Sequence, residues 1–221
     1  RLYGDSANSN LLKAILSINL QTKNIVSTNE IANVLETSPA SVSEMIKKLE
    51  EKNLVNYEKY KGVSLSKIGE KLALDIIRKH RLWETFLVNN LEFSWSEVHD
   101  VAEQLEHIKS EKLTDKLDHF LNYPKFDPHG EPIPSKNGRI TPTNRVLLCE
   151  AAIHTKGIIM GVSTDEKEFL DYLTQLNFKI GSKIKILDII TFDKSIKVEI
   201  ENKIEHISEE VTKNLHIKII K

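Results

Sequence analysis

The sequence predicts a mainly α-helical protein with a smaller β-rich part at its C-terminal end. Apolar residues recur at helical spacing through most of the first 122 residues, whereas residues 146–221 contain stretches that alternate between apolar and polar positions as strands do. Between these parts, four prolines and two glycines fall within residues 124–138, which a helical bundle cannot accommodate. We therefore expect three domains, at residues 1–74, at residues 75–145 with a proline-rich linker, and at residues 146–221.

The composition is that of a soluble globular protein. The 221 residues include 31 Lys plus Arg and 32 Asp plus Glu, and the formal net charge of −1 excludes a globally basic nucleic-acid coat protein. No apolar run approaches the roughly 20 residues of a membrane helix, so we expect no membrane association. The single cysteine, Cys149, excludes an internal disulfide framework and favours a reducing, cytoplasmic location.

Residues 9–65 predict three helices followed by a short hairpin. Ser27 and Glu30 form a capping-box pattern that begins the second helix. Ser38 is a suitable N-cap for the third helix, and Pro39 a suitable first helical residue. The hairpin strands are expected at residues 54–58 and 62–65, with Gly62 at the turn. This order of elements is that of a winged helix-turn-helix unit.

A winged helix-turn-helix unit can read DNA because its third helix fits the major groove. The candidate base-contacting residues lie at the start of that helix and are Ser38, Pro39, Ala40, Ser41, Ser43 and Glu44. The candidate phosphate-contacting residues are Lys47 and Lys48 on the same helix and Lys59, Tyr60 and Lys61 in the hairpin. Three-helix units are common and the local charge is mixed, so a protein-docking role stays open for this unit.

Residues 67–122 are expected to be helical, with breaks near Asn89–Asn90 and Phe93–Ser94. Within residues 98–108, two histidines and two glutamates fall in an arc of roughly 100° on one helix face. These residues are His99, Glu103, Glu106 and His107. Such a face can bind a divalent cation, and a solvated helix face gives the same pattern.

The preceding helix favours the metal-binding interpretation. His80 and Glu84 are one turn apart on a face that also carries Ile76 and Leu87. Burying a carboxylate there costs on the order of several kcal/mol of folding free energy unless the carboxylate is paired or bound to a metal. A structural His–Glu pair satisfies this requirement too, but two helices that each present His and Glu are better explained by a shared metal site. Further candidate ligands, which are otherwise ordinary turn residues, are Asp127, His129 and Asp165.

The C-terminal part predicts a small β-rich barrel. Its strands are expected at residues 183–187, 196–200 and 217–220, and one amphipathic helix is expected at residues 166–176. At roughly 75 residues, this part is large enough for a marginal core of its own.

Together these patterns resemble the diphtheria-toxin-repressor (DtxR) family of metal-dependent transcription regulators, and most closely its manganese-responsive (MntR-like) branch. The resemblance covers about residues 9–221 and is carried by SPASVSEMIKKLEEKNLVNYEKYKGVSLS, RKHRLWETFL, VHDVAEQLEH and DPHGEPIP. It implies a homodimer that represses transcription by binding palindromic operators in double-stranded DNA. It also implies a helical middle domain that dimerises and senses Mn(II) or Fe(II), and an SH3-like (FeoA-like) barrel after it.

The resemblance also implies metal ligands. Glu103, Glu106 and His107 match the primary site, and His80, Glu84 and His99 match an ancillary site. Asp127, His129 and Asp165 match ligands of barrel-containing members. Asn10 stands where the family places Met or Asp, and Lys13 stands where some manganese-type members have Glu.

The implied ligands favour Mn(II). Glu103 and Asp127 stand where relatives often have cysteine, and carboxylates are harder ligands that suit Mn(II). Fe(II) is the second candidate, and Zn(II), Co(II), Ni(II) and Cd(II) are expected to substitute in vitro. No organic cofactor is expected.

Two other functions use the same residues. A metallohydrolase would need an open coordination position and a substrate cleft, but the sequence has no H-E-x-x-H and no nucleophile motif. A metal-binding protein-interaction module would use the helical unit and the barrel as docking surfaces. We expect a regulator and not an enzyme.

Overall fold

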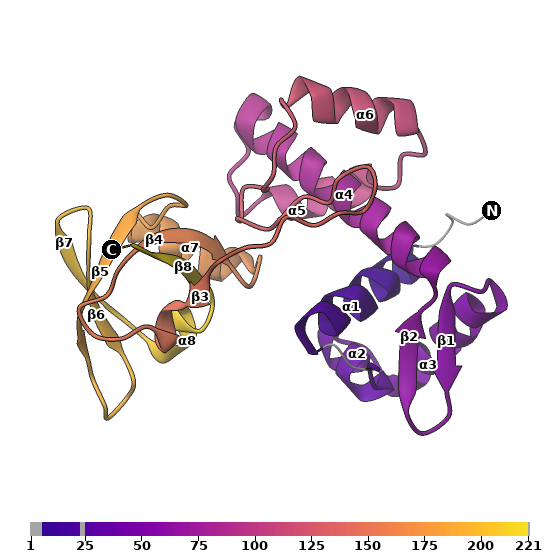
Figure 1. Ribbon diagram of the computed structural model, residues 1–221, viewed down its shortest axis with the longest axis horizontal. Helices are drawn as coiled ribbons and strands as arrows, with labels where there is room; N and C mark the ends of the chain where they lie inside the picture. The colour runs from indigo at the N-terminus through magenta and orange to yellow at the C-terminus, as the bar shows by residue number, and fades with distance from the viewer. Residues whose placement is uncertain (1–5, 23–24, 221) are drawn as a thin grey trace. The chain divides into compact units, whose positions relative to one another are not determined.

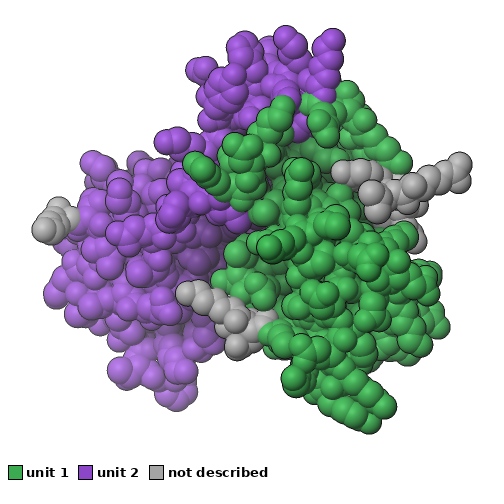
Figure 2. Space-filling model, turned by 45° about the vertical axis from the view of Figure 1, so that its right-hand side comes forward, with its two compact units in different colours: residues 1–80, 104–111, 134–139 green, residues 81–103, 112–133, 140–221 purple. Residues whose placement is uncertain are grey.

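The computed structural model describes residues 6–22 and 25–220 of the chain (Figure 1). These residues form two compact units, which Figure 2 shows in green and purple. The first unit comprises residues 1–80, 104–111 and 134–139, and the second comprises residues 81–103, 112–133 and 140–221. Across the described ranges, no helix combines the length and the apolar character that are needed to cross a bilayer.

The first unit contains the predicted order of three helices and a hairpin. Its helices are α1 (Ser6–Thr22), α2 (Thr28–Val34), α3 (Pro39–Glu51) and the first half of α4 (Lys67–Leu91). The antiparallel hairpin pairs β1 (Val55–Glu58) with β2 (Gly62–Leu65). The prediction of a winged helix-turn-helix unit is therefore confirmed.

The helix starts in this unit follow from local sequence. The Ser27 hydroxyl accepts a hydrogen bond from the backbone N–H of Glu30 at 3.2 Å, and the Glu30 carboxylate accepts one from the N–H of Ser27 at 2.8 Å. At the start of α3, the Ser38 hydroxyl accepts from the N–H of Ser41 at 3.1 Å, and Pro39 takes the first helical position. These side chains satisfy backbone donors that a helix leaves without partners.

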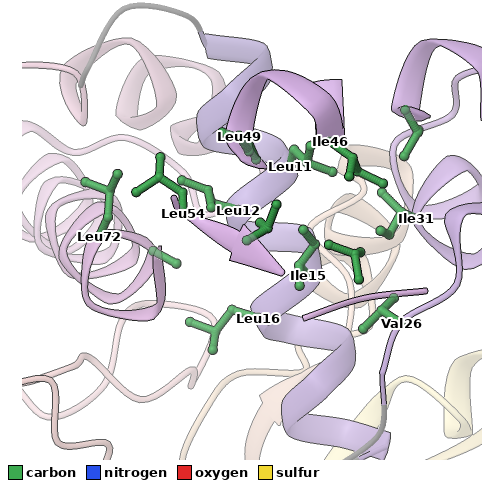
Figure 3. Close-up of a cluster of buried hydrophobic side chains, with 14 of the residues drawn as sticks. Leu11, Leu12, Ile15, Leu16, Val26, Ile31, Ile46, Leu49, Leu54 and Leu72 are labelled. Carbon is green, nitrogen blue, oxygen red and sulfur yellow. The ribbon is translucent and has the colours of Figure 1, made fainter. Parts of the chain in front are cut away.

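One apolar cluster fixes α3 against α1 (Figure 3). Leu11 and Ile15 of α1 are fully buried, and Leu49 of α3 is only 1% exposed. The other side chains labelled in Figure 3 are Leu12, Leu16, Val26, Ile31, Ile46, Leu54 and Leu72. Burying each large aliphatic side chain is worth about 2 kcal/mol, so α3 is firmly held while its opposite face stays in solvent.

The middle helices depart from the prediction at two ends. Helix α4 runs through Asn89–Asn90 to Leu91 and ends where Glu92 takes a positive φ of 59°. The two breaks expected near Asn89–Asn90 and Phe93–Ser94 are therefore a single break that begins after Leu91. Helix α5 (Val98–Leu105) ends two residues before His107, the last residue of the predicted arc. Glu106 and His107 therefore lie in a turn. The last helix of this part is α6 (Glu111–Phe120).

The C-terminal part is a six-stranded antiparallel sheet with the order β3-β8-β4-β5-β6-β7. Its strands are β3 (Val146–Leu147), β4 (Lys156–Val162), β5 (Lys183–Ile189), β6 (Ile196–Ile200), β7 (Lys203–Ile207) and β8 (Leu215–Ile220). The sheet is accompanied by η1 (Leu148–Glu150), α7 (Lys167–Gln175) and α8 (Glu209–Thr212).

The predicted barrel is corrected to an open sheet. Within the described part of the chain, β3 pairs with β8 and β7 pairs with β6, but the two edge strands do not pair with each other. Closing the sheet into a barrel needs a continuous ladder of hydrogen bonds between the two edge strands, and β3 has only two residues with which to form such a ladder. A core of its own still forms between this sheet and α7, around the fully buried Leu170 and Ile186.

Candidate metal centre and nucleic-acid interface

Four segments of the second unit bring titratable side chains together. Glu84 comes from α4, His99 from α5, Asp127 and His129 from the loop before β3, and Asp165 from the loop between β4 and α7. One ligand atom each from Glu84, Asp127 and His129 lies within 4.8 Å of the other two. All three of these side chains are almost completely buried. This spacing suits one divalent cation.

The hydrogen bonds of His129 leave one ring nitrogen directed at this cluster. Its Nε2 lies 2.8 Å from the carbonyl oxygen of Trp95, to which an Nε2–H donates. The other ring nitrogen, Nδ1, is 3.6 Å from Oε2 of Glu84, and it offers a lone pair to a metal ion once its proton is released. A histidine that ligates a metal commonly donates its other N–H to a carbonyl in this way.

The buried charges of this cluster perturb one another strongly. Burial and the negative charge of Glu84 raise the pKa of Asp127 to about 7. Burial opposes the charged form of His129, but its hydrogen bond and attraction to Glu84 outweigh burial and raise the pKa to about 9. The hydrogen bond from His99 to Asp165, and a further one to Glu84, raise the pKa of His99 to about 10. In this arrangement the carboxylates hold a proton on each of the two imidazoles, and a bound metal ion would take the place of those protons as the positive charge of the site.

His99 and Asp165 extend the cluster toward solvent. His99 Nδ1 lies 2.8 Å from Oδ2 of Asp165 and 3.8 Å from Oε1 of Glu84. Asp165 is half exposed, so this side of the cluster is reachable from water. The donors are oxygen and nitrogen atoms without sulfur, a set that fits Mn(II) and Fe(II) better than soft metals.

The loop that carries Asp127 and His129 is docked against strand β4. The carbonyl of His129 accepts from the N–H of Val162 at 3.0 Å. Gly130 has a φ of +82°, and a Cβ atom at this position would lie 2.0 Å from the backbone oxygen of Met160. Only glycine allows this close approach, so the backbone of the loop is fixed by the sheet.

Two arginines and one glutamate that sequence reasoning missed hold the same loop. Arg145 donates to the Gly130 carbonyl at 2.9 Å and to Glu131 Oε1 at 2.6 Å. Arg81 donates to Glu131 Oε2 at 3.3 Å, and its Nε lies 3.6 Å from Oδ2 of Asp127. Glu131 lies within DPHGEPIP, which is a signal that the sequence does offer, but no local pattern marks the two arginines.

A second set of candidate ligands lies in the first unit. Glu106 is fully buried, and its Oε2 is 2.7 Å from Nδ1 of His80. Both Glu106 oxygens also contact Lys13 Nζ, at 2.8 and 3.0 Å. Burial raises the pKa of Glu106, but His80 and Lys13 outweigh burial and hold it below its usual range.

The ten candidate ligands thus divide between the two units. The first unit holds Asn10, His80, Glu106 and His107, and the second holds Glu84, His99, Glu103, Asp127, His129 and Asp165. Asn10, Glu103 and His107 are half-buried. Among the described residues, Nε2 of His107 is buried without a hydrogen-bond partner, as is expected of an atom kept for a ligand.

The candidate DNA-contacting residues all lie on the surface of the first unit. The eleven side chains at the start of α3, along α3 and in the hairpin loop are exposed. Tyr60 is 91% exposed, and the Lys59 ammonium lies 5.0 Å from the centre of its ring. Lys61 pairs with Glu58 at 2.7 Å, which reduces the positive charge of the hairpin.

Three parts of the chain match described protein families. Residues 7–63 match the N-terminal DNA binding domain of iron dependent repressors, and residues 66–135 match the metal binding and dimerisation domain of iron dependent repressors. Residues 146–219 match the FeoA domain.

Individual proteins are similar over different lengths. The chain is 36% identical over 104 residues to the iron-dependent repressor IdeR of Mycobacterium tuberculosis, covering 47% of this chain and 45% of IdeR. It spans less than half the length of the first curated relatives it matches. A solved manganese-dependent transcriptional repressor in complex with manganese is 30% identical, with a TM-score of 0.88 over 96% of this chain and 100% of that one. ScaR with bound Zn2+ is 31% identical, with a TM-score of 0.81 over 96% and 99%.

Proposed function

Because the chain belongs to the iron-dependent repressor family of metal-dependent DNA-binding repressors, we propose that it is a Mn(II)-responsive repressor that binds palindromic operators as a homodimer. Fe(II) is the second candidate, and Zn(II), Co(II), Ni(II) and Cd(II) are proposed to substitute in vitro. We propose that it acts in the cytoplasm, without catalytic activity, organic cofactor or membrane contact. We propose three domains, at residues 1–74, 75–145 and 146–221.

One observation supports the metal assignment above the others. Glu84 and Asp127 are buried together beside His129, whose Nδ1 lies 3.6 Å from Oε2 of Glu84. Two adjacent buried carboxylates destabilise each other unless a proton or a cation lies between them. A divalent cation supplies that positive charge when bound, and His99 and Asp165 would complete its ligand set. Asn10, His80, Glu106 and His107 of the first unit are proposed as a second ligand set, and Glu103 of the second unit is proposed as a further ligand.

In the proposed mechanism, residues around the cluster connect the segments that carry the ligands. Arg81 and Arg145 hold the loop of Asp127 and His129 through Glu131, and His99 ties α5 to the loop before α7 through Asp165. Neutralising this cluster favours the arrangement in which all these segments are joined. A ligand shifts such an equilibrium only by its differential affinity, commonly about 1–3 kcal/mol. In the dimer, two α3 helices reach successive major-groove faces when they stand about 34 Å apart.

Operator binding with and without metal tests this function. We expect Mn(II) to tighten binding of the full chain to a fluorescein-labelled palindromic DNA by about 5- to 150-fold relative to chelator, the usual range of allosteric coupling. Fluorescence polarisation at fixed ionic strength measures the effect. Equal affinity in Mn(II) and in chelator, for operators selected from genomic fragments, contradicts the proposal.

Replacing Lys59 with Ala tests the hairpin as a phosphate contact. We expect Lys59→Ala to weaken binding to all DNA sequences alike and to reduce the slope of log affinity against log salt by about 1, because one phosphate contact is lost. Polarisation titrations at several salt concentrations measure the slope. Lys203→Ala, an exposed lysine on the edge strand β7, is the control. An unchanged slope in Lys59→Ala means that the hairpin does not contact DNA.

A further inference from the structure

Lys13 forms an ion pair with Glu106, the carboxylate of the second proposed ligand set. Lys13 Nζ contacts Glu106 Oε1 at 2.8 Å and Oε2 at 3.0 Å. Oε2 also faces Nδ1 of His80 at 2.7 Å. Both oxygens of this fully buried carboxylate are therefore already engaged by the chain's own donors. The contact joins residues that are far apart in sequence, and local helix formation does not produce it.

The position of Lys13 makes this pair more than a surface salt bridge. Lys13 lies on α1 between Leu12 and Ala14, which are both buried in the core of the first unit. Its own side chain is only 20% exposed. An ammonium in such a place is tolerated because it is paired, and removing either partner leaves an uncompensated buried charge. The Lys13–Glu106 pair is thus a structural element of this unit.

We propose that Lys13 is an internal cation that occupies the Glu106 carboxylate until a metal ion displaces it, and that it thereby sets the metal concentration at which Glu106 becomes a ligand. This inference rests on the proposed metal-sensing function and adds a threshold to one of its two ligand sets. A divalent cation bound to Glu106 repels an ammonium held within 3 Å of the same carboxylate. The two cations therefore compete.

The geometry provides a route for the displaced group. The Lys13 side chain is 20% exposed, so part of it is already in contact with water. The flexible four-carbon stem can rotate its ammonium into solvent while its methylene groups remain against α1. At the cluster of Glu84, Asp127 and His129, the guanidinium of Arg81 stands farther off, with its Nε 3.6 Å from Oδ2 of Asp127, whereas Lys13 contacts both oxygens of Glu106 within 3.0 Å. The two ligand sets should then fill at different Mn(II) concentrations, with the Glu106 set filling second.

Replacing Lys13 with Met tests this inference on the full chain. Methionine keeps a long unbranched side chain and removes the charge. Titration with Mn(II), with free Mn(II) followed by electron paramagnetic resonance, is expected to show the weaker class of sites about tenfold tighter or more in Lys13→Met, within the usual range of coupling between sites. In chelator, the melting temperature of Lys13→Met is expected to fall, and saturating Mn(II) restores it. Lys13→Arg keeps the cation and is expected to titrate like the wild type.

The controls separate this inference from the function on which it rests. Lys67→Met removes an exposed lysine at the start of α4 in the same unit and should leave both properties unchanged. If Lys13→Met does not fold, Lys13→Gln replaces it. If the wild type binds Mn(II) and the charge-removing variant binds it with the same affinity and stoichiometry, the proposed role of Lys13 is wrong, while the proposed function stands. If no variant and no wild-type protein binds Mn(II), the proposed function falls and takes this inference with it.

Discussion

Replacing Glu84 with Gln is expected to weaken Mn(II) binding by at least about 100-fold and to abolish the metal-dependent tightening of DNA binding. Breaking a buried charge interaction by removing one partner typically costs about 3–5 kcal/mol, which corresponds to two or more powers of ten in affinity. Glu84 is the shared neighbour of His99 and His129, so its carboxylate links the two halves of the cluster. Gln has nearly the same volume and lacks only the charge.

The metal-free stability of this variant distinguishes a ligand from a structural residue. Removing the charge of Glu84 relieves its repulsion of Asp127, whose pKa it raises, but also removes its attraction for His99 and His129, whose pKa values it raises too, so the two effects oppose each other in the metal-free protein. We therefore expect the melting temperature of Glu84→Gln in chelator to stay within a few degrees of the wild type. Isothermal titration calorimetry with Mn(II) gives the affinity. Glu70→Gln, an exposed glutamate in the first turn of the same helix, is the matched control. Wild-type Mn(II) affinity in Glu84→Gln would remove this cluster from the mechanism.

Replacing Gly130 with Ala is expected to weaken Mn(II) binding by about 10- to 100-fold and to lower the melting temperature as well. The new methyl group would lie 2.0 Å from the Met160 oxygen, so the loop must leave strand β4. That movement breaks the hydrogen bond between His129 and Val162 and displaces two proposed ligands together. A displacement of about 1 Å is enough to cost two powers of ten at a preorganised site.

Gly181 offers an unusually close control for this variant. Its φ of +92° matches that of Gly130, but a Cβ atom there meets nothing within 4 Å. Gly181→Ala therefore carries the backbone strain of a positive φ, about 1–2 kcal/mol, without the steric clash. If both variants bind Mn(II) equally well, the docking of the loop on β4 does not position the ligands.

Local signals account for the parts of the fold that the sequence predicts correctly. The capping box of Ser27 and Glu30 and the Ser38–Pro39 helix start each act within four residues, so sequence alone specifies them. Strand β4 was not predicted, since two glycines interrupt its apolar pattern and its partner β8 lies far along the chain. The early end of α5 was not predicted either, because no helix-breaking residue marks it in the local sequence. Instead, Glu106 just after the helix contacts Lys13 and His80, which are distant in sequence.

The candidate site follows the same division between local and distant causes. Residue type and helical spacing suffice to propose Glu84 and His99 as ligands, because both lie on helices with regular periodicity. The contact between Asp165 and His99 depends on how a loop before α7 returns to α5, and spacing along the chain carries no information about it. Arg81 and Arg145 act through Glu131, so their role becomes visible only in coordinates.

The pairing of β4 with β8 has a consequence for biosynthesis. Leu215 lies opposite Val162, the same residue whose N–H holds the His129 carbonyl. A nascent chain that has not yet emerged from the ribosome as far as β8 lacks a neighbour for β4 on that side. Pairing between distant segments is also slow to form, so the loop of Asp127 and His129 reaches its final position after the helices that precede it. A prematurely terminated product would therefore keep α3 and lack the strand pairing that positions the loop of proposed ligands.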